Sequence, residues 1–443
     1  MVKIFKSSAK SKQIKQKHVE LSIESLDQLS RGVGRVNGKV CFVAGALPGE
    51  TVKAQITEDK KQFCQAKLVK IIHASPERVE PECPWFNQCG GCQLQHLAVQ
   101  NQIDVKQLRV DDLFAKSGIK NLPWQKALQG ESWQYRTRTR LSTWYEGKHN
   151  RLRVGFRQLN SKKLIEIDQC LVIAPLFSKL LPDLVQTLNL LECKKHITHL
   201  EFNSASEYKV IVLRVLKALT DKDMKRLSAF SSEHKFSLYL LDDNAHYTAV
   251  RADESELFYQ IDDLHVRFGL SDFTQVNQQM NLAMIRQAKD WLDLKTDDCL
   301  LDLFCGLGNF SLPMAQKVQS VTGIEGSQSM VEKAQANAEF NHLDNLSFIK
   351  RDLNQGDALA EIDLAQFNKI ILDPSRDGAA KITQNSHIWS ANLVLYIACE
   401  PNALVRDTQL LLANGYQLQK ISVIDMFPHT SHVETMALFR KCK

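Results

Sequence analysis

Apolar and polar positions alternate in short runs over residues 18–73. The runs are separated by turn residues, among them Asn37-Gly38 and Pro48-Gly49. Alternation with a period of two places the apolar side chains of a strand on one face, and an Asn-Gly pair favours a tight hairpin. The pattern therefore predicts a small all-β barrel over 18–73.

Beyond residue 263 the period of the hydrophobic pattern changes. Short apolar runs alternate with longer amphipathic segments, which is typical of a doubly wound parallel sheet covered by helices. We expect strands at 299–303, 320–325, 346–350, 369–373 and 393–398, and a β-rich final stretch at 418–440. The region 263–443 is therefore predicted to be an α/β domain of the Rossmann-like class.

Residues 74–262 form a central, β-rich region. It opens on a cysteine cluster and includes a helical stretch at 94–120 that can pack on the α/β domain. Six arginines follow at strand-like spacing, interleaved with four aromatic residues: Arg136, Arg138, Arg140, Arg151, Arg153 and Arg157, with Trp133, Tyr135, Trp144 and Tyr145. A solvated sheet face would explain such a run, but cations beside aromatic rings favour contact with RNA phosphates and bases.

Composition narrows the class of protein. The 443 residues are 44% hydrophobic and 24% charged with a formal net charge of +6, which is typical of a globular protein of two or three domains. No apolar run approaches the roughly 20 residues that span a bilayer, and the basic segment 1–17 has no signal-peptide core. We therefore expect a cytoplasmic protein whose cysteines are reduced.

A glycine turn follows the first predicted strand of the α/β domain, at residues 302–310. A dinucleotide-binding turn would have a third glycine where Ser311 stands, so pyrophosphate binding is disfavoured. Glu325 and Asp352 end the next two predicted strands, where carboxylates can bind ribose hydroxyls and an adenine amino group. Solvated loop acids are the alternative, but this layout is that of class I methyltransferases. Their donor, S-adenosylmethionine, carries a sulfonium cation that acidic groups complement.

The next strand ends bring reactive groups to the same edge. Cys399 ends the fifth strand, and although such a cysteine is usually a small buried residue, a thiol beside a methyl donor can act as a nucleophile. Carbon 5 of uracil accepts a methyl group only after a thiolate adds to carbon 6, and a base must then remove the carbon 5 proton. Glu434, in an apolar strand that would raise its pKa, is the candidate base. His429 and His432 compete with it.

Five motifs in order along the chain carry a resemblance: 273–277 (FTQVN), 302–309 (DLFCGLGN), 373–378 (DPSRDG), 399–401 (CEP) and 432–434 (HVE). This set is similar to the RNA uracil-5 methyltransferases. The resemblance implies methylation of carbon 5 of a uridine, with Cys399 as nucleophile and Glu434 as base. It also implies that six residues line the S-adenosylmethionine site: Gln275, Phe304, Asn309, Glu325, Asp352 and Asp373.

Three closely spaced thiols, Cys83, Cys89 and Cys92, have Cys170 downstream as a candidate fourth ligand. Their spacing fits zinc and an iron-sulfur cluster equally, and unliganded core cysteines remain an alternative. Residues 18–72 resemble the TRAM module, an OB-like barrel of RNA-modifying enzymes. The cluster and the module together resemble the iron-sulfur enzymes of 23S ribosomal RNA. That resemblance implies a [4Fe-4S] cluster holding the shape of the central region, and 23S ribosomal RNA as partner.

One residue departs from the family pattern. Asparagine usually follows the nucleophile, whereas this chain has Glu400, a carboxylate that would oppose thiolate formation unless its side chain turns away. An inactive RNA-binding factor is therefore a rival hypothesis. The other rivals, which do not depend on Glu400, are a nucleotide-dependent oxidoreductase with an iron-sulfur centre and a uracil-5 methyltransferase of another rRNA or tRNA site. For the enzyme we expect a monomer, with no DNA or membrane partner.

Overall fold

The computed structural model describes residues 17–159, 161–205, 208–252 and 256–442. The lysines of the predicted basic tail before residue 17 lie outside the described residues. The chain divides into two compact units. One comprises the residues up to Glu82 together with Gln93–Val105, and the other comprises Cys83–Cys92 together with the chain from Lys106 onward. No helix in the described part of the chain is long and apolar enough to cross a membrane.

The first unit contains the predicted barrel. Its five strands are β1 (His18–Leu26), β2 (Gly32–Val36), β3 (Lys39–Ala44), β4 (Thr51–Asp59) and β5 (Phe63–His73), and they close in the order β1-β2-β3-β5-β4. The alternating apolar residues point inward and form one core, which includes Cys41, Val43 and Val52. Gly34 allows β1 and β2 to approach closely, because a Cβ there would lie 2.3 Å from the carbonyl oxygen of Ser22.

The second unit has two large sheets. The first is built by the central region and runs in the order β12-β11-β10-β9-β6-β7-β8. Its strands are β6 (Arg138–Glu146), β7 (Arg151–Arg157), β8 (Leu164–Glu166), β9 (Ile197–Ala205), β10 (Tyr208–Val215), β11 (Ser237–Leu241) and β12 (Tyr247–Arg251). Helices α2 (Pro175–Asn189) and α3 (Asp221–Glu233) share one apolar core with it. The helix expected at 94–120 is α1 (Val99–Lys116).

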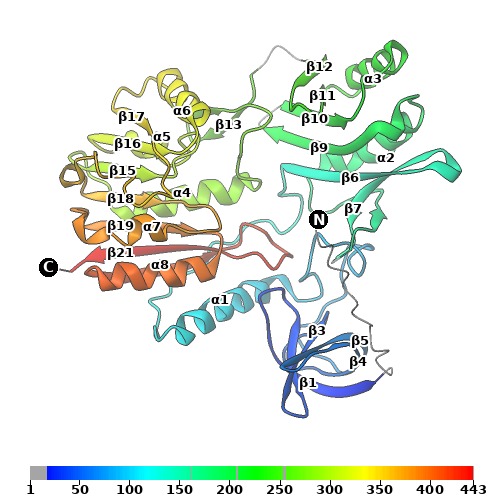
Figure 1. Cartoon of the computed structure of the whole chain (residues 1–443), viewed down its shortest axis with the longest axis horizontal. Coiled ribbons are helices and arrows are strands. Elements are labelled where there is room, and N and C mark those ends of the chain that lie inside the picture. Colours follow the sequence, from blue (N-terminus) through cyan, green and yellow to red (C-terminus); the bar gives the residue numbers. More distant parts are fainter. Residues whose placement is uncertain (1–16, 160, 206–207, 253–255, 443) are drawn as a thin grey trace, which may run out of the picture. The chain divides into compact units, whose positions relative to one another are not determined.

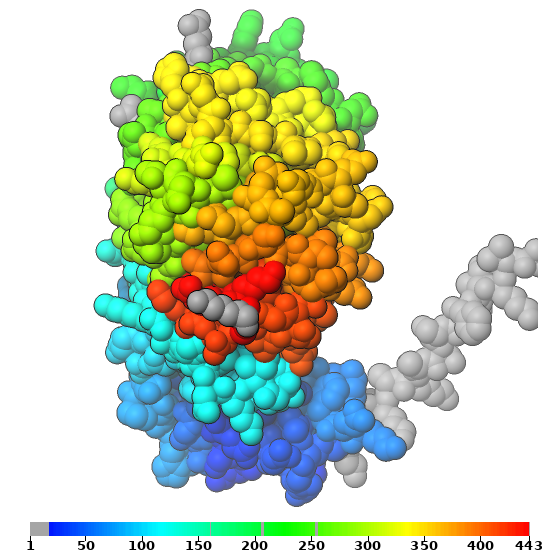
Figure 2. All heavy atoms as spheres, turned by 90° about the vertical axis from the view of Figure 1, so that its left-hand side faces the viewer, coloured from blue at the N-terminus to red at the C-terminus, as the bar shows by residue number. Residues whose placement is uncertain are grey.

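The second sheet of this unit is the predicted α/β sheet, in the order β17-β16-β15-β18-β19-β21-β20 (Figure 1). Its strands are β15 (Cys299–Leu303), β16 (Ser320–Glu325), β17 (Leu346–Lys350), β18 (Lys369–Leu372), β19 (Leu393–Ala398), β20 (Tyr416–Ile424) and β21 (Glu434–Lys441). The five predicted parallel strands are confirmed, one of them a residue shorter. β21 runs antiparallel to both of its neighbours. In the space-filling view, yellow residues are followed by orange and then by red ones, which is the direction of the strand order from β17 to β20 (Figure 2).

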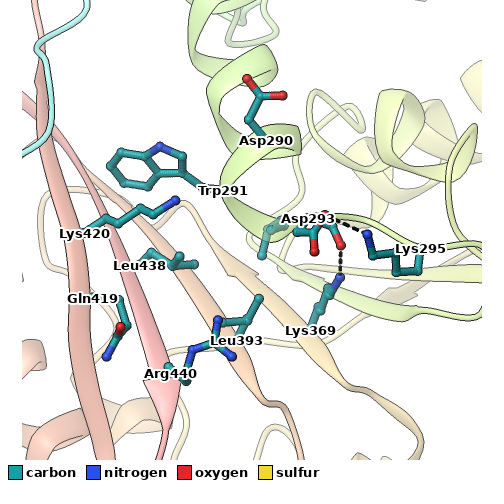
Figure 3. A pocket seen from close by; sticks show the side chains of 11 residues that line it. Asp290, Trp291, Asp293, Lys295, Lys369, Leu393, Gln419, Lys420, Leu438 and Arg440 are labelled. Atoms are coloured by element: carbon teal, nitrogen blue, oxygen red, sulfur yellow. Dashed lines mark hydrogen bonds and ion pairs between the residues drawn. The ribbon is translucent and has the colours of Figure 1, made fainter.

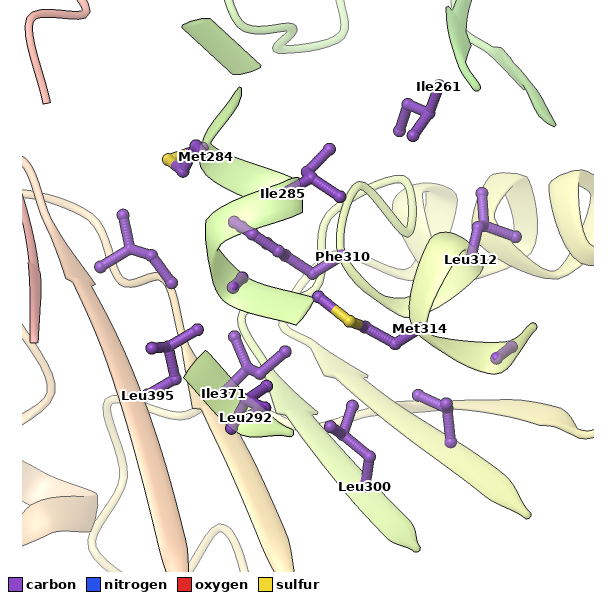
Figure 4. Packing of buried hydrophobic residues seen from close by; sticks show 14 of the residues in the cluster. Ile261, Met284, Ile285, Leu292, Leu300, Phe310, Leu312, Met314, Ile371 and Leu395 are labelled. Atoms are coloured by element: carbon purple, nitrogen blue, oxygen red, sulfur yellow. The ribbon is translucent and has the colours of Figure 1, made fainter. Parts of the chain in front are cut away.

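Helices cover this sheet because its strands are apolar along their length. The helices are α4 (Gln278–Leu292), α5 (Ser311–Ala315), α6 (Gln328–Phe340), α7 (Ala380–Thr383) and α8 (Pro401–Ala413), and the hairpin β13 (Phe258–Ile261) and β14 (Leu264–Arg267) precedes them. Met284 and Leu292 of α4 pack with Leu300, Ile371 and Leu395 of the sheet (Figure 4). The carboxyl ends of β15, β16, β18 and β19 therefore meet at one edge, where ligands of such sheets bind.

Candidate active site

The turn after β15 bends sharply at the carboxyl edge of the sheet. Phe304, Gly306 and Gly308 all have positive φ angles, of 67°, 56° and 90°. Glycine adopts this conformation readily, but Phe304 has a Cβ that disfavours it, so the surrounding structure must hold Phe304 in place. Its N–H donates to the carbonyl of Ile324, 2.9 Å away, on the neighbouring strand. The turn thus keeps its backbone close to the end of β16.

Glu325, the last residue of β16, connects two backbone segments. Its carboxylate accepts hydrogen bonds from the N–H of Gly306 (3.2 Å) and from the N–H of Ser327 (3.0 Å). Asp352, beyond the end of β17, is exposed. Hydrogen bonds from the backbone N–H of Asn354 and from the side chains of Gln355 and Asn354 lower the pKa of Asp352. Both predicted acids therefore follow the carboxyl ends of successive strands, as the sequence indicated.

The two amide side chains predicted for the donor site, Gln275 and Asn309, lie near the same polar residues. Asn309 exchanges two hydrogen bonds of 2.9 Å with Asn281 of α4 and accepts a third, of 3.1 Å, from the hydroxyl of Tyr259. Gln275 lines a small hollow together with Tyr259 and Asn281. Gln275 and Asn309, 34 residues apart in sequence, are thus brought to the same neighbourhood by the start of α4.

Cys399 and Glu434 stand on adjacent strands at this edge. β19 and β21 are antiparallel and pair with Ala398 opposite Thr435. Cys399, which follows Ala398, therefore lies beside Glu434, which precedes Thr435. Burial, followed by the charges of Glu434 and Asp373, raises the pKa of Cys399 to about 12, while Arg376 acts in the opposite direction. Glu434 is only 6% exposed, and burial and the charge of Asp373 raise its pKa to about 8.

Two more carboxyl groups lie behind the same edge. Asp302 is fully buried and accepts a hydrogen bond of 2.5 Å from the hydroxyl of Ser311. Burial raises the pKa of both Asp302 and Asp373 to about 7. The sequence motif contained Asp302, but the sequence analysis assigned it no role. Its burial on a strand with apolar neighbours on both sides is the signal that could have singled it out.

The four cysteines of the predicted cluster are each partly buried. Burial, together with the charges of Cys170 and Cys83, raises the pKa of Cys89 to about 11. Cys83 also acts on Cys170, so these thiols lie within electrostatic reach of one another. Among the described residues, however, no three histidine, cysteine or acidic side chains are arranged to hold a metal ion. The structure nevertheless brings Cys83, Cys89 and Cys170 near one another.

The sequence matches the model of the tRNA (uracil-5-)-methyltransferase family over residues 98–442, and the TRAM domain over residues 15–69. The chain belongs to this family of RNA uracil-5 methyltransferases. It is 41% identical to the 23S rRNA (uracil(1939)-C(5))-methyltransferase RlmD of Shewanella sp. (strain W3-18-1), an alignment that covers 100% of both chains. It is 42% identical to the enzyme of the same name from Shewanella halifaxensis, over 99% of both.

Among solved structures, the chain is similar to Pyrococcus abyssi tRNA (uracil-54, C5)-methyltransferase, which was determined in complex with S-adenosyl-L-homocysteine. The TM-score is 0.73 at 21% sequence identity, and the match covers 95% of this chain and 100% of the other. The methyltransferase fold of the uracil-5 family is therefore shared, and the five-stranded barrel is a TRAM domain.

Glu400, the departure from the family pattern, begins helix α8. Its carboxylate accepts hydrogen bonds from the backbone N–H (3.2 Å) and the side-chain amide (2.7 Å) of Asn402, so it caps the helix. An acid at a helix N-terminus is stabilised by the exposed N–H groups there. The carboxylate of Glu400 is thus engaged by the start of α8, and Glu400 is not among the charges that raise the pKa of Cys399.

The competing bases occupy different environments. The ring of His429 is 2% exposed and stacks on Trp133, with 3.8 Å between the ring centroids. Burial and the neighbouring Lys106 lower the pKa of His429 to about 4. His432 is exposed, and its ring packs edge-on against Phe427. Of the three candidates, Glu434 is the one that register pairing brings beside Cys399.

Several residues predicted to contact RNA have structural partners instead. Arg138 donates to the backbone carbonyls of Leu270 and Asp272, ahead of α4. Tyr135 is buried, which makes the expectation of a stacking surface wrong for this ring. Trp144, in contrast, is 57% exposed. Strand alternation in the sequence does not separate arginines that bind backbone carbonyls from arginines that face solvent.

A hollow of about 330 Å³ lies at the C-terminal end of α4 (Figure 3). Lys369 and Leu393, which line it, are the first residues of β18 and β19. The hollow is therefore at the amino ends of the parallel strands, opposite the edge where ligands of such sheets bind.

Proposed function

We propose that this protein transfers a methyl group from S-adenosylmethionine to carbon 5 of a uridine in 23S ribosomal RNA. The observation that carries the proposal is the pair of Cys399 and Glu434 at the carboxyl edge of the sheet, the edge that also carries the glycine turn after β15. The reaction needs a thiol and a separate base within reach of one pyrimidine ring. The relatives named as 23S rRNA methyltransferases support the choice of substrate. Such a protein would work in the cytoplasm as a monomer.

The acids and amides of the carboxyl edge fit the donor. Glu325 would accept hydrogen bonds from the ribose hydroxyls, and Asp352 from the adenine amino group. The four remaining residues of the proposed donor site are Gln275, Phe304, Asn309 and Asp373. Burial raises the pKa of Asp302 and Asp373 to about 7, and a sulfonium cation bound at this edge would favour their ionised forms, which complement its charge. Bound S-adenosylmethionine would supply the methyl group.

In the proposed reaction the sulfur of Cys399 adds to carbon 6 of the uracil and makes carbon 5 nucleophilic. The thiol must first lose its proton, a step opposed by burial and favoured by Arg376. After carbon 5 has received the methyl group, Glu434 takes the carbon 5 proton. The electron pair of that C–H bond restores the ring double bond, the bond between sulfur and carbon 6 breaks, and Cys399 is regenerated. A carboxyl group with a pKa of about 8 is a suitable acceptor near neutral pH.

We further propose that Cys83, Cys89, Cys92 and Cys170 hold a [4Fe-4S] cluster that shapes the central region. The N–H of Gly91 donates to the sulfur of Cys89 over 3.4 Å. Burial raises the pKa of Cys170, while the backbone N–H groups of Val172 and Ile173 act in the opposite direction. Such donors are suited to anionic sulfur ligands. Zinc is the alternative metal, and methyl transfer requires no net electron flow from either.

RNA contact is proposed for the barrel of the first unit and for the open face of the central sheet. His199 lies on that face. Its pKa is lowered by burial and then by the charges of three arginines, Arg140, Arg214 and Arg157. These cations would attract phosphates. Exposed Trp144 and Phe273 offer aromatic faces to unstacked bases.

The deciding experiment compares ribosomal RNA from cells with and without the gene by mass mapping of 5-methyluridine. We expect one 5-methyluridine in 23S ribosomal RNA to disappear without the gene and to return when the purified protein and S-adenosylmethionine are added to that RNA. An unchanged 23S map with a loss in transfer RNA would overturn the proposed substrate. An unchanged map in both would favour an inactive RNA-binding factor.

A further inference from the structure

The loop between β20 and β21, residues 425–433, leads directly into Glu434 and is held from outside by side chains. Three consecutive carbonyl oxygens of the loop each accept a hydrogen bond from a different, distant part of the chain. The donors are Nδ2 of Asn277 to Met426 (3.2 Å), Nζ of Lys106 to Phe427 (3.0 Å) and the hydroxyl of Tyr135 to Pro428 (3.1 Å). Arg109 adds a fourth bond, to the carbonyl of Ser431 at 3.0 Å. The path of the loop is therefore set by side chains outside it.

Lys106 makes the strongest of these connections. Its ammonium group has no exposed surface and lies 2.6 Å from Oδ1 of Asp425, which is itself buried, at the first position of the loop. A buried ammonium group is costly unless it is paired and hydrogen-bonded. Here one ion donates to a carboxylate and to a carbonyl two residues further on, so it fixes two points of the same loop.

The later part of the loop is constrained as well. His429 has a φ angle of 65°, a backbone conformation that non-glycine residues rarely adopt, and its ring stacks on Trp133. Ile424, just before the loop, pairs with Glu434, just after it. A shift at Asp425 would therefore be transmitted to the start of β21, where Glu434 faces Cys399.

We propose that Lys106 is a positioning residue for the reaction. By anchoring residues 425–433 through Asp425 and Phe427, it holds Glu434 where it can remove the carbon 5 proton. This inference rests on the proposed function, in which Glu434 is the base. The hydrogen bonds of Lys106 go to Asp425 and Phe427, which are neither proposed donor residues nor the nucleophile, so the loss of Lys106 should impair proton removal more than donor binding.

A second buried lysine in the same unit provides a matched control. Lys369 pairs with Asp298, both buried, and donates to the carbonyl of Asp293 over 2.8 Å (Figure 3). Lys369 thus has the same kinds of partner as Lys106, one carboxylate and one backbone carbonyl. It lies at the amino ends of the strands, opposite the reaction edge. Methionine is similar in size to lysine but has no charge. Replacing each lysine with methionine therefore removes one buried cation, at the reaction edge for Lys106 and at the opposite edge for Lys369.

The test compares Lys106→Met with Lys369→Met in the full-length protein. For each, we would measure the melting temperature, the dissociation constant of S-adenosylmethionine and the amount of protein-RNA adduct that survives denaturing electrophoresis. Both variants should lose stability. For Lys106→Met we expect a turnover number up to about a hundredfold lower at saturating RNA, since small displacements of reacting groups can cost this much. Its covalent adduct should accumulate, and donor affinity should stay within twofold of the unchanged chain.

Lys369→Met should show normal turnover per folded molecule and no adduct. If Lys106→Met does not fold, Lys106→Met/Asp425→Leu removes both buried charges and should show the same adduct, because the anchor is still lost. Lys106→Arg, which keeps the positive charge, should restore part of the turnover. Equal turnover in the two single variants, or slow turnover without adduct, would overturn the positioning role. If Glu434→Gln itself forms no adduct, the assignment of the base fails instead, and the two failures are distinguishable.

Discussion

Replacing Glu434 with glutamine removes the ionisable group and keeps nearly the same shape. The pKa of Glu434 is raised to about 8 by burial and by Asp373, so only about one tenth of the carboxyl groups are ionised at pH 7. The resting protein therefore already accommodates a neutral side chain at this position. We expect Glu434→Gln to fold with nearly unchanged stability, and to bind donor and RNA.

The expected effect falls on one step. Addition of Cys399 to carbon 6 and methyl transfer to carbon 5 precede proton removal, so both should proceed in the variant. General base catalysis typically accelerates proton removal by about 10²- to 10⁴-fold, and the lifetime of the methylated adduct should lengthen by a similar factor. Since the target base must leave its stack to reach the thiol, the trapped species is a flipped nucleotide bonded to sulfur.

Denaturing electrophoresis with methyl-labelled donor measures this directly. A slowly migrating, labelled protein-RNA band is expected for Glu434→Gln, and its absence is expected for the double variant Glu434→Gln/Cys399→Ala. A folded Glu434→Gln protein that binds donor and RNA and turns over normally would refute the assignment. His432, exposed near Phe427, would then be the next base to test.

Three further outcomes are expected. Cys399→Ala should abolish methylation while leaving donor affinity nearly unchanged; Cys305→Ala is the control, and loss of activity in Cys305→Ala alone would mean that the nucleophile is misassigned. In single turnover, the decay of the adduct should become about tenfold faster per pH unit up to about pH 8, because the ionised form of Glu434 is lost as the pH falls below its raised pKa; a flat profile would contradict this. Protein purified without oxygen should carry about four irons per chain, and stoichiometric zinc without sulfide would exclude the cluster.

The elements of the fold could be predicted where burial is uniform. β18 and β19 are buried along their whole length, and the apolar runs 370–372 and 393–398 mark them plainly in the sequence. The barrel was equally clear because alternation and turn residues coincide there. The candidate residues Glu325, at the end of β16, and Cys399, directly after β19, followed from the rule that ligands bind at the carboxyl edge.

What the sequence could not supply is the partner of each polar side chain. Arg138 and Tyr135 have the composition of an RNA-binding strand, yet they bind the carbonyls of Asp272 and Pro428. Both partners are more than 130 residues away in sequence. Strand periodicity specifies the face that a side chain occupies, and carries no information about which distant carbonyl will meet that face.

The same limit applies with more force to the reaction centre. The chemistry of uracil required a base, and an apolar strand near the C-terminus pointed to Glu434, but nothing local shows how its loop is held. The anchor is Lys106, 319 residues before its partner Asp425. A buried lysine is indistinguishable in sequence from a surface lysine on the same helix. The position of the base therefore depends on a residue far outside the α/β domain. A fragment beginning at residue 263 would retain Cys399, Glu434 and the contact of Asn277, but would lose Lys106, Arg109 and Tyr135, three of the four side chains that hold the loop.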